Sequence, residues 1–122
     1  MNNTGFKPNL FLGLAEKLID DVKYNESSRS RVVVGRAYYA AFLGARNRLR
    51  QLGHSFNKYT SEHQQVLNGL TLRKYHLGDK LATLFDKRVD ADYHMDTDIK
   101  KDTGTQCIRL AKQIIQELSI IK

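Results

Sequence analysis

The sequence predicts an all-α protein, built as an antiparallel up-and-down bundle of about five helices. Apolar residues recur at helical spacings of three and four, and the alternation typical of strands is absent. Helix breakers are sparse, with 1 proline and 8 glycines in 122 residues. A hydrophobic content of 41% and a charged content of 27% are typical of a globular domain. At this length, residues 1–122 are expected to form a single domain.

The first helix is predicted from about Pro8 to Tyr24, because proline is favoured in the first helical turn. Helical spacing places a set of apolar residues on one face of this segment. We expect that face to be buried, and it consists of Leu14, Ala15, Leu18, Ile19 and Val22.

The second helix is expected to begin near Ser27 or Ser28, favoured N-caps, and to reach about Leu52, where Gly53 ends it. One side is apolar, with alanines that allow close helix approach: Val34, Ala37, Tyr38, Ala41, Phe42, Ala45, Leu49 and Leu52. The other side carries four arginines within about 100°, interspersed with apolar residues: Arg29, Arg36, Arg46, Arg50, Val32, Tyr39 and Leu43. This mixed face is expected to pack under another helix, to form a dimer contact or to hold a polyanion.

Three further helices are predicted from the same spacing. The third begins near Thr60 or Ser61 and places Val66, Leu67 and Leu70 together. The fourth covers about residues 76–93. The fifth begins near Thr97 or Asp98, continues to the C-terminus and carries a clear apolar stripe: Cys107, Leu110, Ala111, Ile114, Ile115, Leu118 and Ile121.

The charge is unevenly distributed along a chain whose net charge is +7. Residues 27–60 contain no acid but seven cations, whereas residues 86–102 contain six aspartates. The two segments are expected either to pair within the fold or across a dimer, or to leave a basic surface for nucleic acid. Arg36, Arg46 and Arg50 are the candidate RNA-binding residues on that surface.

An arginine interrupts the apolar stripe of the fourth helix. Leu77, Leu81 and Leu84 predict a buried series whose next member is Arg88. Burying a guanidinium without a partner is costly, and Asp92, one turn later, is the obvious ion-pair partner. The pair is either a structural salt bridge or the edge of a cleft where Arg88 meets a phosphate through its planar donors.

A histidine follows Arg88 at the spacing Arg-x5-His. On a straight helix, Arg88 and His94 would point about 120° apart. They would meet either through fraying of the helix near Tyr93 or across a symmetric dimer. Asp90 lies one turn before His94, where it can orient or charge the imidazole.

Two blocks of this chain resemble the HEPN domain family. The run RAYYAAF (36–42), followed by ARNRL, resembles the signature helix of that family, and LATLFDKRVDADY (81–93) resembles a second block of its small stand-alone members. The start FLGLAEKL (11–18) and the position of His63 also fit the family pattern.

The resemblance implies a helical bundle that forms homodimers in prokaryotic toxin-antitoxin or other defence systems. Many members are metal-independent endoribonucleases with an Arg-x4-6-His motif, which Arg88 and His94 match as the catalytic pair, supported by Asp90, Asp92 and Tyr93. A minimal nucleotidyltransferase antitoxin is a possible partner, since it can adenylylate a tyrosine near the motif in some members. Val89 replaces the usual polar neighbour. The alternative is a non-catalytic HEPN module that binds a nucleotidyltransferase, RNA or a nucleotide.

Several other classes of site and location are not indicated. Neither a metal nor a cofactor is expected, because Cys107 is alone and the His, Asp and Glu residues do not cluster at zinc-ligand spacing. No apolar run approaches the roughly 18 residues of a membrane span, and neither a signal peptide nor a disulfide is indicated, so a cytoplasmic location is expected. Of the other histidines, we expect His63 to cap or pack and His76 to be exposed, while His54 forms a second Arg-x5-His with Arg48.

Overall fold

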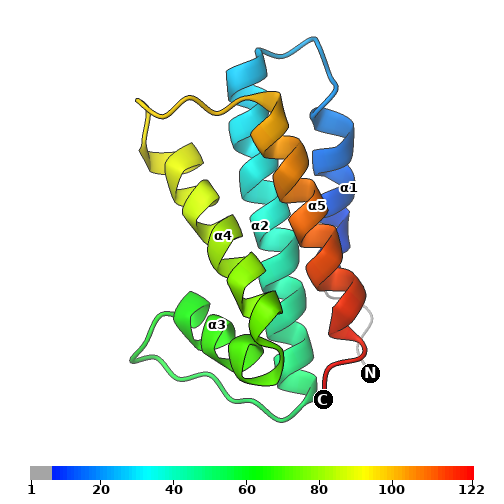
Figure 1. The fold of residues 1–122 in the computed structure, drawn as a ribbon, viewed down its shortest axis with the longest axis vertical. Helices are drawn as coiled ribbons and strands as arrows, with labels where there is room; N and C mark the ends of the chain where they lie inside the picture. The colour runs from blue at the N-terminus through cyan, green and yellow to red at the C-terminus, as the bar shows by residue number, and fades with distance from the viewer. Residues whose placement is uncertain (1–6) are drawn as a thin grey trace.

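The computed structural model describes residues 7–122, and five helices account for most of that range (Figure 1). They are α1 (Asn9–Leu18), α2 (Glu26–Gln51), α3 (Glu62–Arg73), α4 (Tyr75–Tyr93) and α5 (Lys101–Leu118). Helices α1, α2, α4 and α5 run alternately up and down, and the short α3 lies at the end where α2 finishes and α4 begins (Figure 1). The predicted all-α bundle is therefore confirmed.

Helix α2 is the central element and packs against each of the other four helices. Its alanines at positions 37, 40, 41 and 45 are fully buried, which lets neighbouring backbones approach closely. The stripe of α5 is buried against α2 at Cys107, Ile108, Ala111, Ile114 and Leu118. The core thus extends along α2, and the side chains of α2 that avoid it are available for other contacts.

The first helix is shorter than its sequence predicts. Helix α1 ends at Leu18, and the turns that follow leave Val22 86% exposed, while Leu14 is 50% exposed. The Arg29 guanidinium donates from Nε to the Ile19 carbonyl (3.0 Å) and from Nη1 to the Tyr24 carbonyl (2.7 Å). These two bonds hold the chain in a turn after α1, so the apolar spacing beyond Ile19 does not continue as helix.

The predicted caps are partly correct. Ser61 caps α3 by accepting a hydrogen bond from the Gln64 N–H, and Gly53 follows α2 with a φ of 96° that only glycine adopts easily. Helix α2, however, is capped by Asn25 rather than by Ser27 or Ser28, since the Asn25 side chain accepts from the Ser28 N–H at 3.1 Å.

The last helix begins later than predicted, at Lys101 instead of Thr97 or Asp98. Its first turn is completed by Glu26, whose carboxylate accepts the Lys101 N–H at 3.2 Å. Residues 94–100 form a loop that crosses from α4 to α5 (Figure 1), and Ile99 within this loop is buried. Within residues 7–122, no helix has both the length and the apolar character needed to cross a membrane.

Candidate functional site

Arg88 continues the buried stripe of α4 and is held by two polar partners. Leu77, Leu81 and Leu84 have no exposed surface, whereas the Arg88 side chain is 20% exposed. Its Nε donates to Asp92 at 2.9 Å, and its Nη2 donates to the Tyr39 hydroxyl at 3.0 Å. The predicted ion pair with Asp92 is therefore confirmed. The pair is partly open to solvent, not sealed in the core.

Three aromatic rings surround the same guanidinium. The Arg88 Cζ atom lies 5.7 Å from the ring centre of Tyr38, 5.3 Å from that of Tyr39 and 5.8 Å from that of Tyr93. Ring faces attract a cation without neutralising it. Arg88 thus keeps a positive charge that one carboxylate and three π-systems hold in place. Tyr93, the outermost ring, is 67% exposed.

A pocket of about 140 Å³ adjoins this arginine, and its lining includes both Asp92 and Tyr39, the two partners of Arg88. Arg36 also lines it, with its guanidinium carbon 5.1 Å from the ring centre of Phe11. Among residues 7–122, no carboxylate or carbonyl accepts a hydrogen bond from Arg36. The pocket therefore places Arg36, which has no hydrogen-bond acceptor in the described part of the chain, beside Tyr39 and Asp92, the two residues that bind Arg88.

The other two arginines proposed to bind RNA have a different role in the fold. Arg46 donates to Glu62 at 2.9 Å, and Arg50 lies 3.7 Å from the other oxygen of the same carboxylate. Both residues are used to join α2 to α3, and neither lines the pocket. Only Arg36 of the three predicted RNA contacts lies there. In the described part of the chain, no cation of residues 27–60 forms a salt bridge with an aspartate of residues 86–102, so the predicted pairing within the fold is wrong. Pairing across a dimer stays a prediction.

His94 is the C-cap of α4, directly after Tyr93, and its side chain is 56% exposed. Its Nδ1 lies 2.8 Å from Asp90 Oδ1, which confirms that Asp90 orients this histidine. Asp90 and Asp92 are separated by about 200° around a helix, so the Arg88–Asp92 and Asp90–His94 pairs face nearly opposite sides of α4. Among residues 7–122, the polar partners of the Arg88 guanidinium are Asp92 and Tyr39, and no hydrogen bond joins it to the His94 ring. One protomer therefore holds both groups without joining them.

A second histidine contacts the aromatic rings near Arg88, which the sequence did not indicate. The Tyr38 hydroxyl lies 2.7 Å from His63 Nδ1, and the His63 ring stacks on Phe85 with centroids 3.8 Å apart. The expected packing role of His63 is thus confirmed, but its place beside Arg88 is new. Burial, and then the charge of Arg88, lower the pKa of His63, while the weaker influence of Asp86 raises it; burial also raises the pKa of Tyr38.

This depressed pKa predicts a stability loss in mild acid. Because folding favours the neutral imidazole, the unfolded chain binds more protons once the pH falls below the ordinary histidine value of 6.5. The stabilising contribution is complete above that value and is lost as the pH falls towards the pKa of the folded state. We expect the wild-type melting temperature to fall more between about pH 7.5 and about pH 5.5 than that of His63→Gln. His54→Gln is the control for removing a histidine, and equal slopes for all three proteins would contradict the prediction.

The charged and sulfur side chains of residues 7–122 form no group of three or more His, Cys, Asp or Glu suited to a metal ion. A family model described as HEPN domain matches residues 10–121, nearly the whole chain. No curated protein matches the chain.

Proposed function

This chain belongs to the HEPN domain family, and on that premise we propose that it is a metal-independent endoribonuclease that uses Arg88 and His94 at a homodimer interface. The observation that carries the proposal is the partly open pocket beside Arg88. Its lining includes Tyr39 and Asp92, which both bind Arg88, and Arg36, whose guanidinium has no acceptor in the described part of the chain. A guanidinium without an acceptor in this pocket, next to the two residues that bind Arg88, is suited to an anionic phosphodiester.

Arg88 is oriented to donate further hydrogen bonds. Its Nε and Nη2 are directed at Asp92 and Tyr39, while Nη1 has no acceptor among residues 7–122. A phosphate in the pocket would accept from Nη1 and from Arg36. As the phosphorus becomes pentacoordinate, negative charge grows on its oxygens, and a fixed guanidinium stabilises that charge more than it stabilises the ground state.

His94 supplies the proton transfer that the reaction needs. The RNA 2′-hydroxyl attacks the adjacent phosphorus, the bond to the 5′-oxygen breaks, and a 2′,3′-cyclic phosphate forms. When Nδ1–H of His94 donates to the Asp90 carboxylate, Nε2 is the free basic nitrogen and can take the proton from the 2′-hydroxyl. The imidazolium that results returns this proton to the leaving 5′-oxygen, so one His94 at each site completes the cleavage.

We place this activity in a toxin-antitoxin or other defence system of a prokaryote, with a minimal nucleotidyltransferase as the antitoxin. The exposed Tyr93 ring, stacked near Arg88, is the candidate for adenylylation. A nucleotide attached there would add negative charge and bulk beside Arg88, which would oppose binding of an RNA phosphate.

A non-catalytic HEPN module is the second candidate. It is favoured by one observation, the opposed directions of the Arg88–Asp92 and Asp90–His94 pairs in a single protomer. In that case the pocket would bind RNA or a nucleotide, or the surface would bind a nucleotidyltransferase, without cleavage.

The two candidates are separated by incubating the purified wild-type protein with end-labelled RNA in excess chelator. The endoribonuclease is expected to cleave at an undiminished rate and to leave 2′,3′-cyclic phosphate ends, because no step needs a metal. Salt-sensitive RNA binding with no cleavage would reject the nuclease and support the binding module. A protein that cleaves only after metal is restored would contradict the proposed chemistry.

A further inference from the structure

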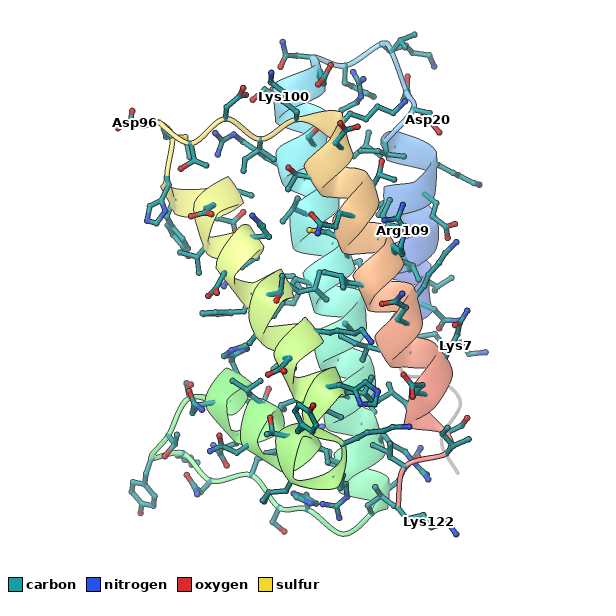
Figure 2. The ribbon with its side chains drawn as sticks, in the orientation of Figure 1. Lys7, Asp20, Asp96, Lys100, Arg109 and Lys122 are labelled. Carbon is teal, nitrogen blue, oxygen red and sulfur yellow. The ribbon has the colours of Figure 1, made fainter. Side chains whose placement is uncertain are left out.

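The C-terminal end of α4 and the loop after it are held by one guanidinium from α2, that of Arg31. Its Nη1 donates to the carbonyls of Asp90 at 3.2 Å, Ala91 at 2.9 Å and His94 at 3.4 Å, and its Nη2 donates to the carbonyl of Thr97. All of these acceptors belong to backbone that lies 59 to 66 residues further along the chain. The loop spans from α4 to α5 past α2, with Asp96 and Lys100 marking its course (Figure 2).

Several of these carbonyls lie at the C-terminal end of α4. The last carbonyls of a helix have no partner within the helix and carry partial negative charge. Helix α4 has no basic residue in its own last turn that could meet this need. Arg31 supplies the charge from a neighbouring helix, and it lies between Ser30 and residues 33–34 of α2, which are all fully buried. The donor is therefore attached to one of the most firmly packed parts of the fold.

His94 lies in the middle of this hydrogen-bonded segment. Its N–H donates to the Asp90 carbonyl and its own carbonyl accepts from the Thr97 N–H, both at 3.1 Å. Arg31 donates to both of these carbonyls and also to the Thr97 carbonyl. The Asp90 side chain in turn binds the His94 ring. Arg31 thus binds the backbone before His94, at Asp90 and Ala91, and after it, at Thr97, and the position of the imidazole depends on this backbone.

Arg31 also lines the pocket beside Arg88, together with Arg36, Tyr39 and Asp92. The Arg31 side chain therefore forms part of the pocket wall and also binds the backbone of His94. It connects these two places although the Arg88–Asp92 and Asp90–His94 pairs face different sides of α4. We propose that Arg31 is a positioning residue that sets the placement of His94 relative to the pocket. Its relevance to cleavage depends on the proposed function, whereas its control of the His94 backbone does not.

The chain offers a matched control in the same helix. Arg48 of α2 also binds backbone carbonyls after a helix, since its Nη2 donates to Ser119 at 3.4 Å and to Ile121 at 2.9 Å. Those acceptors follow α5, and Arg48 does not line the pocket beside Arg88. Arg48→Met removes a similar contact and so measures what a merely structural loss does to the site.

The test compares Arg31→Met, Arg31→Lys and Arg48→Met with the wild type by NMR. In Arg31→Met we expect the His94 ring resonances to shift and the amides of His94 and Thr97 to exchange about tenfold faster or more, because several charge-assisted hydrogen bonds are lost. Arg31→Lys keeps the positive charge but loses the planar set of N–H donors of the guanidinium, so its exchange rates are expected to lie between those of the wild type and Arg31→Met. Arg48→Met is expected to leave the His94 and Thr97 signals unchanged. The proposal is overturned if Arg31→Met matches the wild type there, or if Arg48→Met changes those signals equally.

A kinetic measurement then connects the placement of His94 to cleavage. In a protein that cleaves RNA, Arg31→Met is expected to lower kcat and leave KM unchanged, because its donors bind protein carbonyls and not the substrate. A raised KM with unchanged kcat would overturn the positioning role in favour of direct RNA contact. If the wild type does not cleave RNA at all, the proposed function fails, while the NMR result still decides whether Arg31 fixes the His94 segment.

Discussion

His94→Ala is expected to lower the rate of RNA cleavage about 100- to 10,000-fold, the usual contribution of a general acid or base. The fold should be nearly unaffected, because the imidazole is 56% exposed and its described hydrogen bond is to Asp90 alone. Single-turnover cleavage of labelled RNA measures the rate, and thermal unfolding measures the stability of the same preparation. A large loss of rate with an unchanged melting temperature would place His94 in the chemistry.

The matched control is the other histidine at Arg-x5-His spacing, His54. Its arginine, Arg48, donates to carbonyls near the C-terminus, and the His54 ring packs so closely over Gly69 that a Cβ there would lie 3.1 Å from it. His54→Ala is therefore expected to retain cleavage and to lose some stability through packing. Equal loss of cleavage in the two variants, or a wild-type rate in His94→Ala, would contradict the role given to His94.

Features set by local spacing were predictable from the sequence. The ion pairs Arg88–Asp92 and Asp90–His94 each join residues one helical turn apart, so a helix prediction is sufficient to expect them. The buried stripes of α4 and α5 follow from periodicity for the same reason. These features identify the motif residues and their immediate partners, Asp92 for Arg88 and Asp90 for His94.

Features that depend on packing between helices could not be predicted in this way. The contacts of Arg31 with the end of α4 and of Tyr38 with His63 join distant segments. Periodicity indicates which face of a helix is buried but not which residue of another helix it meets. The shorter α1 has the same origin, since Arg29 reaches back from α2 to the carbonyl of Ile19. Three arginines of α2 bind backbone carbonyls at or after the ends of α1, α4 and α5, and a sequence pattern does not reveal such pairs.

The different directions of the Arg88–Asp92 and Asp90–His94 pairs limit how Arg88 and His94 can act on one substrate. Within one chain Arg88 pairs with Asp92 and His94 pairs with Asp90, and these pairs are directed to different sides of α4. A shared phosphate is therefore expected to meet Arg88 of one chain and His94 of the other. A two-fold dimer whose axis lies beside α4 would bring α4 of both protomers to one interface and would provide two such composite sites. The proposed chemistry therefore predicts a homodimer, and light scattering of the purified protein tests that prediction directly.

Mixing Arg88→Ala with His94→Ala is expected to restore cleavage that neither variant shows alone. A mixed dimer has one composite site with both residues intact and one with both replaced. With free exchange, half of the dimers are mixed, so about a quarter of the wild-type rate should return. Co-refolded mixtures are compared with each variant alone. The reverse mixture, wild type with Arg88→Ala/His94→Ala, should keep about a quarter of the activity for shared sites and about half if each chain holds its own site. Failure of the first mixture to recover, with half the activity kept in the second, would show that Arg88 and His94 act within one chain.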